Sequence, residues 1–194
     1  MSSIDAAIDA LRQAQPIVIP TDTVYGIAVL PHAAGAIEAL FAAKRRPTNR
    51  PLPVLGESIA DLRRVVTFDP RATAIGKRFW PGPLTAILPR APAFIDYLGE
   101  GAETAVAVRV PRNEIALELL HQVGPLAVTS ANLSGEPPAL TYEEARAALG
   151  RVVPLVIDGG RMSGRASTIV SLIDEPALVR EGEVSLSEVQ SVIW

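Results

Sequence analysis

The sequence has 194 residues, 48% of them hydrophobic, and a formal net charge of -3. This length and composition allow one packed core, so we expect a single domain over residues 1–194. Two histidines, two methionines and no cysteine exclude a disulfide framework and a thiol nucleophile, and leave little material for a zinc, iron–sulfur or haem site. The sequence also lacks a secretory signal pattern and any apolar run near the roughly 20 residues that cross a bilayer, so we expect a cytoplasmic protein.

Hydrophobic periodicity divides the chain into short buried strands and helices, with prolines and glycines between them. In chain order we predict a helix at 4–14, strands at 17–19 and 24–30, helices at 33–43, 58–66 and 69–80, strands at 84–88 and 105–110, a helix at 113–123, a strand at 125–129, a helix beginning at 141, strands at 152–157, 168–173 and 178–180, and a short helix after 185. Strands that alternate with helices in this way predict a mixed or parallel sheet covered by helices, in a three-layered α/β fold.

The most distinctive stretch is the basic loop at residues 44–55, which holds four cations within its first seven positions and no acidic residue. Its three prolines bias the backbone toward extended conformations, so we expect an ordered loop rather than a basic helix. In a chain with a net negative charge, this local excess predicts a site for an anion such as phosphate or carboxylate. A solvated charged loop without a ligand is the alternative that this stretch leaves open.

Four further segments place polar residues where a core does not require them. Residues 20–26 set hydroxyls and one carboxylate between two predicted strands, and Arg109 is the only charge in an apolar strand, where it could clamp a carboxylate or phosphate. Residues 129–135 bring short hydroxyls to the end of a strand, where ligands sit in open α/β sheets. Residues 167–170 precede Arg180, at the end of the last strand. Ordinary turns, loops and strand ends are the competing interpretation of each segment.

Taken in order, these segments resemble the L-threonylcarbamoyladenylate synthases of the YrdC/TsaC type, in their short single-domain form. The matching stretches are 20–26 (PTDTVYG), 44–47 (KRRP) with 51–52 (PL), 80–85 (WPGPLT), 108–111 (VRVP), 130–135 (SANLSG) and 167–170 (STIV). Six motifs in family order are far more specific than any one of them. The resemblance implies a YrdC-like fold, in which a twisted mixed sheet is covered by helices around a basic concave site.

The resemblance implies the ATP-dependent synthesis of L-threonylcarbamoyl-AMP from L-threonine and bicarbonate, with release of pyrophosphate. The product supplies the threonylcarbamoyl group of the tRNA adenosine next to the anticodon, directly or through downstream transfer proteins. The amine of threonine takes up CO2 and the resulting carbamate attacks the α-phosphate, so no protein nucleophile is required. Mg2+ would accompany ATP, bound mainly to phosphate oxygens, and we expect no protein metal ligand.

The resemblance also implies roles for individual residues. The residues expected to bind ATP are Lys44, Arg46, Arg50, Ser130, Asn132 and Arg180. Within that set, the first two would also stabilise charge on the phosphates during the reaction. The residues expected to bind L-threonine are Thr23, Arg109 and Ser167.

A few positions depart from the family pattern. Arg50 stands where Asn or Lys is frequent, which adds charge, and Leu55 stands where many members have a histidine, which would loosen amino-acid selection. Ala105 and Val106 stand where a threonine is expected, and Glu181 where proline is usual.

Two other functions stay open. One is a noncatalytic YrdC-like module that binds tRNA or double-stranded RNA, which the acidic balance and the absence of an aromatic ladder disfavour. The other is a carbamoyl-handling paralogue, which normally belongs to a much longer chain.

Overall fold

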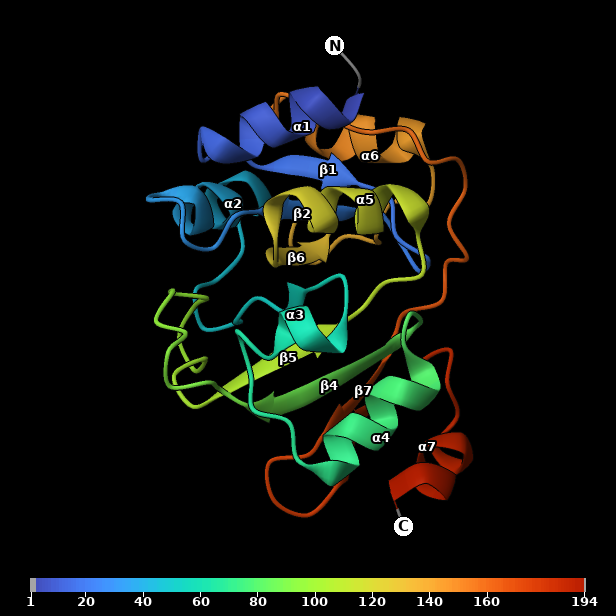
Figure 1. Ribbon diagram of the computed structural model, residues 1–194. Helices are drawn as coiled ribbons and strands as arrows, with labels where there is room; N and C mark the ends of the chain where they lie inside the picture. The colour runs from blue at the N-terminus through green and yellow to red at the C-terminus, as the bar shows by residue number, and fades with distance from the viewer. Residues whose placement is uncertain (1–2, 194) are drawn as a thin grey trace.

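The computed structural model describes residues 3–193 (Figure 1). Within this range the elements are α1 (Ser3–Arg12), β1 (Ile17–Ile19), β2 (Gly26–Val29), α2 (Ala36–Lys44), β3 (Val54–Leu55), α3 (Ile59–Leu62), α4 (Pro70–Phe79), β4 (Leu84–Pro89), β5 (Ala105–Arg109), α5 (Glu114–Val123), β6 (Leu126–Ser130), α6 (Tyr142–Leu149), β7 (Thr168–Ser171), β8 (Ala177–Arg180) and α7 (Leu186–Ile193). Helices α1 and α7 lie at opposite ends of the molecule (Figure 1).

The strands form one eight-stranded sheet in the order β1-β2-β6-β3-β5-β4-β7-β8. Two neighbouring pairs, β3 with β5 and β4 with β7, are parallel, and the other pairs are antiparallel. The sheet is therefore mixed, as the sequence predicts. Its order also brings together strands that are far apart in the chain, because β6 pairs with both β2 and β3.

Apolar side chains on the two faces of the sheet form two separate cores. One core joins α1 and α5 to alternate residues of β1, β2 and β6, and the other joins α2, α4 and α6 to the opposite face. The alternation is visible in β1, where Ile17 and Ile19 belong to the first core and Val18 to the second. Helices on both faces make the three layers that the sequence predicts.

Local sequence explains where the helices begin. Asp69 is the N-cap of α4 and accepts a hydrogen bond from the backbone N–H of Ala72 at 2.7 Å, with Pro70 in the first turn. Asn113 and Thr141 cap α5 and α6 in the same way. Of the helices formed by residues 3–193, none is long and apolar enough to cross a membrane.

Three sequence predictions need correction. Residues 152–157 form no strand: Val156 makes one isolated bridge with Val18, and Pro154, which has no N–H, interrupts the run. The helix expected at 58–66 is limited to α3, because the chain turns after Leu62 and Val66 bridges to Arg90. Strand β3 is not expected from the sequence, since two residues are too few to show a period.

Tyr25 ties the beginning of β2 to the loop before β7, and it supports a first prediction. Its side chain is fully buried, and its hydroxyl donates to Gly160 O (2.8 Å) and accepts from Gly159 N (3.0 Å). Tyr25→Phe leaves both backbone groups without this partner, so we expect a loss of about 1–3 kcal/mol in the free energy of unfolding, measured by urea denaturation. Tyr142→Phe, which removes only a 3.4 Å contact with Arg146, should cost less than about 0.5 kcal/mol; equal losses would contradict the prediction.

Candidate functional site

A turn rich in hydroxyls precedes β2. The hydroxyl of Thr21 accepts from the backbone N–H groups of Thr23 (3.2 Å) and Val24 (3.3 Å) and donates to Val24 O (2.6 Å). This ring of bonds closes the turn locally, as expected of a threonine in such a position. It also fixes Asp22 and Thr23 so that both side chains meet Arg109.

Arg109 ends β5 and is 6% exposed. Its Nε donates to Gly82 O at 3.0 Å and one terminal nitrogen donates to the hydroxyl of Thr23 at 3.1 Å, while the other forms an ion pair with Asp22. Burial lowers the pKa of Arg109 and the Asp22 carboxylate opposes that shift. Arginine stays charged even when buried, so the site holds a permanent cation.

Ser167, which is also predicted to bind L-threonine, lies on the same face of the sheet as Arg109. On β4 and β5 the core side chains include Ala86 and Val108, which pair with each other, so Thr85 and Arg109 both point to the opposite face. The Thr85 hydroxyl lies 2.9 Å from the hydroxyl of Ser167, which precedes β7. Arg109 and Ser167 therefore flank Thr85 on one surface.

Arg180 joins this group rather than the loop at 130–132. Its terminal nitrogen donates to the carbonyl oxygen of Ser167 at 2.8 Å and to the Ser167 hydroxyl at 3.3 Å. Burial is the main cause that lowers the pKa of Arg109, and the charge of Arg180 acts in the same direction. The role expected for Arg180 in ATP binding stays a prediction.

Lys44 lies at the carboxyl end of α2 and is 1% exposed. Its ammonium donates to the carbonyl oxygens of Ser130 (2.5 Å) and Asn132 (2.7 Å) and to Asn132 Oδ1 (3.0 Å). Burial lowers the pKa of Lys44 to about 8, and the nearby charge of Arg46 contributes. The structure thus joins three of the residues that the sequence assigns to ATP. An ATP phosphate that reached the ammonium would have to replace one of these contacts.

The remaining cations of the basic loop have different surroundings. Arg46 is half-buried and donates through Nε to the carbonyl oxygen of Arg50 at 2.9 Å, which closes the loop on itself. Burial lowers the pKa of Arg46, and the charge of Arg50 adds to that effect. The side chain of Arg50 is exposed. The loop is therefore ordered, as its prolines predict, and it presents positive charge to solvent.

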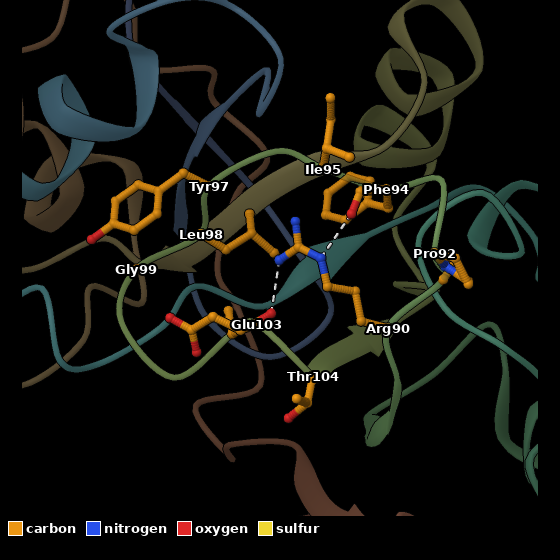
Figure 2. A pocket seen from close by; sticks show the side chains of 11 residues that line it. Arg90, Pro92, Phe94, Ile95, Tyr97, Leu98, Gly99, Glu103 and Thr104 are labelled. Carbon is orange, nitrogen blue, oxygen red and sulfur yellow. Dashed lines mark hydrogen bonds between the residues drawn. The ribbon is translucent and has the colours of Figure 1, made fainter.

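The connection between β4 and β5 is hydrogen-bonded to the backbone of the basic loop. The backbone N–H of Leu52 donates to Leu98 O at 2.7 Å, and Glu100 N donates to Thr48 O at 2.8 Å. Residues 90–104 also line a cavity of about 590 Å³, in which Arg90 donates to the backbone oxygens of the same connection (Figure 2). None of the nine residues that the sequence assigns to ATP or threonine lines this cavity.

Two polar residues of the site were not assigned a role from the sequence, namely Asp22 and Thr85. Asp22 is the one carboxylate in a hydroxyl-rich turn, and Arg109 is the one cation in an apolar strand, so their opposite charges were the available signal. Leu55 pairs in register with Arg109 and belongs to the core formed with α5. Its apolar side chain lies on the Arg109 face of the sheet, at the position where many relatives are expected to carry histidine.

Among residues 3–193, no group of three or more histidine, aspartate or glutamate side chains gathers in a way that could hold a metal ion.

The fold and these contacts define an α/β protein with a buried arginine site beside an ordered basic loop. The Sua5/YciO/YrdC family model, described as "Telomere recombination", matches residues 9–182. A protein of Mycobacterium tuberculosis is 39% identical over 193 residues, which cover 98% of this chain and 88% of that protein. The threonylcarbamoyl-AMP synthase of Sodalis glossinidius is 38% identical over 163 residues, 81% of this chain and 85% of the relative.

The fold comparison agrees with the sequence comparison. The structure of Pyrococcus abyssi Sua5 complexed with L-threonine superposes with a TM-score of 0.92 at 34% identity, covering 100% of this chain and 58% of that one. The chain belongs to the Sua5/YciO/YrdC family, as its six motifs predict.

Proposed function

We propose that the chain is a threonylcarbamoyl-AMP synthase, which joins L-threonine, bicarbonate and ATP and releases pyrophosphate for the modification of tRNA. The observation that carries the proposal is the buried Arg109 in a chain whose relatives bear this activity. Among residues 3–193 the guanidinium has three hydrogen-bond partners, so two of its five N–H donors are available to a substrate carboxylate. Arginine binds carboxylates through such paired donors.

The two groups of residues divide the substrates between them. Thr23, Arg109 and Ser167 form the L-threonine site, and Lys44 with the Ser130–Asn132 loop and the cations at 46 and 50 forms the ATP site. The threonine carbamate is itself the nucleophile, so the protein contributes alignment of two anions and neutralisation of charge. Mg2+ bound to the ATP phosphates would supply further charge neutralisation there.

The experiment that tests the function is pyrophosphate release from ATP and Mg2+ in bicarbonate buffer, with L-threonine, with L-serine and without an amino acid. We expect release that depends on threonine and is weaker with serine, although the apolar Leu55 beside Arg109 would reduce this discrimination. No release with any amino acid, from a chain that binds ATP, would overturn the proposal. A salt titration of tRNA binding would then test the RNA-module alternative. Pyrophosphate release with carbamoyl phosphate would test the carbamoyl-handling alternative.

The pKa of Lys44 leads to a second prediction, on the pH dependence of ATP binding. A triphosphate near the ammonium favours its charged form, so binding raises a pKa that lies at about 8 in the free protein. We therefore expect ATP binding to take up a proton above pH 8, and ATP affinity to fall as the pH rises through that value. Calorimetry at pH 8.5 in two buffers of different ionisation enthalpy measures the uptake, which Lys44→Met should abolish; equal uptake in both proteins would assign it to another group.

A further inference from the structure

We propose that Asp22 recognises the amino group of the amino-acid substrate, so that the Arg109–Asp22 ion pair binds both charged groups of one molecule. This inference rests on the proposed function, because it concerns the same amino-acid site. It adds a specificity-determining residue to the three residues that the family motifs assign to threonine.

The two oxygens of the Asp22 carboxylate have different surroundings. Oδ1 accepts from the guanidinium of Arg109, and the Asp22 side chain is only 14% exposed. Oδ2 is buried, and the part of the chain that the structure describes gives it no hydrogen-bond partner. A buried carboxylate oxygen without a donor costs stability, and native proteins rarely keep one unless a ligand or another group completes it.

Hydrogen bonds on both sides of Asp22 fix its backbone. The bonds of Thr21 hold the turn on one side, and on the other the carbonyl oxygen of Thr23 accepts from the backbone N–H of Gly164 at 2.9 Å. The carboxylate is therefore held beside the guanidinium through Oδ1, while Oδ2 has no hydrogen-bond partner among the described residues. What Oδ2 requires is a hydrogen-bond donor, preferably one with positive charge.

The α-amino group of an amino acid meets this requirement. In an α-amino acid, the amine and the carboxylate are attached to the same carbon, so a molecule whose carboxylate takes the two remaining donors of Arg109 brings its amine close to Arg109's other partner, Asp22. The ion pair thus presents a cation and an anion in the arrangement that a zwitterion complements.

The test measures binding of two ligands by calorimetry without ATP or Mg2+: L-threonine, and the 2,3-dihydroxybutanoate of matching configuration, in which a hydroxyl replaces the amine. In Asp22→Asn, Oδ1 can still accept from Arg109, but an NH2 group replaces Oδ2 and faces the substrate amine. We expect threonine affinity to fall by at least about tenfold, while affinity for the hydroxy analogue changes by less than about threefold. Asp174→Asn, which removes the same charge from the exposed turn before β8, should bind both ligands like the wild type.

The outcomes separate this inference from the proposed function. Equal losses for the two ligands would show that Asp22 only positions Arg109, and an unchanged threonine affinity would show that Oδ2 does not meet the amine; either result overturns the inference and leaves the function standing. If Asp22→Asn does not fold, the test uses the wild-type protein alone. The inference then requires that this protein bind threonine at least about tenfold more tightly than the hydroxy analogue. A wild type that binds neither ligand overturns the function together with the inference.

Discussion

Arg109→Ala is expected to abolish threonine binding in the millimolar range and to leave ATP affinity within about twofold of the wild type. The guanidinium is the buried cation of the proposed amino-acid site, and charge-assisted paired bonds to a carboxylate are among the strongest polar contacts in proteins. We expect a loss of about hundredfold in threonine affinity, which corresponds to about 2.7 kcal/mol. Calorimetric titrations with threonine and with ATP, each alone, measure the two effects separately.

The same substitution also affects stability, so it needs matched variants. Removing Arg109 leaves the Asp22 carboxylate buried without its partner, and breaking a buried pair from one side costs about 3–5 kcal/mol. Arg109→Lys keeps the charge but not the planar fork, and it should retain part of the threonine affinity. Arg109→Met combined with Asp22→Asn removes both charges, and it should be more stable than Arg109→Met alone while still failing to bind threonine. If the single alanine variant lost ATP and threonine affinity equally, the role of Arg109 would be wrong.

The sequence predicts most of this site because its polar residues interrupt otherwise apolar segments. Arg109 among valines and the hydroxyls at 20–26 are unusual enough to be noticed without a structure. Their pairing depends on the sheet, whose order joins strands far apart in the chain, and periodicity within one strand carries no information about its neighbours. For this reason the sequence alone does not identify Asp22 as a site residue, although its charge is complementary to that of Arg109.

The surroundings of Lys44 were less predictable. Its position between a helix and a proline-rich loop does not indicate that the ammonium is buried against backbone carbonyl groups 86 and 88 residues away. Backbone acceptors have no sequence signature, so such a contact is seen only in three dimensions. At residues 152–157 the sequence instead predicts a strand that does not form. Their apolar composition matches a strand, but Pro154 limits the pairing to one bridge.

Lys44→Met is expected to weaken ATP binding by at least about tenfold and to leave threonine affinity within about twofold. Methionine keeps most of the buried stem, so the change isolates the ammonium. Its loss leaves the oxygens of Ser130 and Asn132 without their charged donor, and hydrogen bonds to charged groups contribute about 1.5–3 kcal/mol. The Ser130–Asn132 loop, which would hold the nucleotide, then loses its hydrogen bonds to the ammonium, and the phosphates lose a nearby cation. Titration calorimetry and urea denaturation measure the two consequences.

A control on the same loop separates a specific role of Lys44 from the general charge of the cluster. Arg45 is exposed and has a φ of 51°, a conformation that asparagine tolerates, so Arg45→Asn removes one positive charge without strain. If ATP affinity fell equally in Arg45→Asn and Lys44→Met, the basic loop would act only through its summed charge. A loss confined to Lys44→Met, and rescued in part by Lys44→Arg, would instead mean that the buried ammonium joins the helix end, the Ser130–Asn132 loop and the nucleotide into one site.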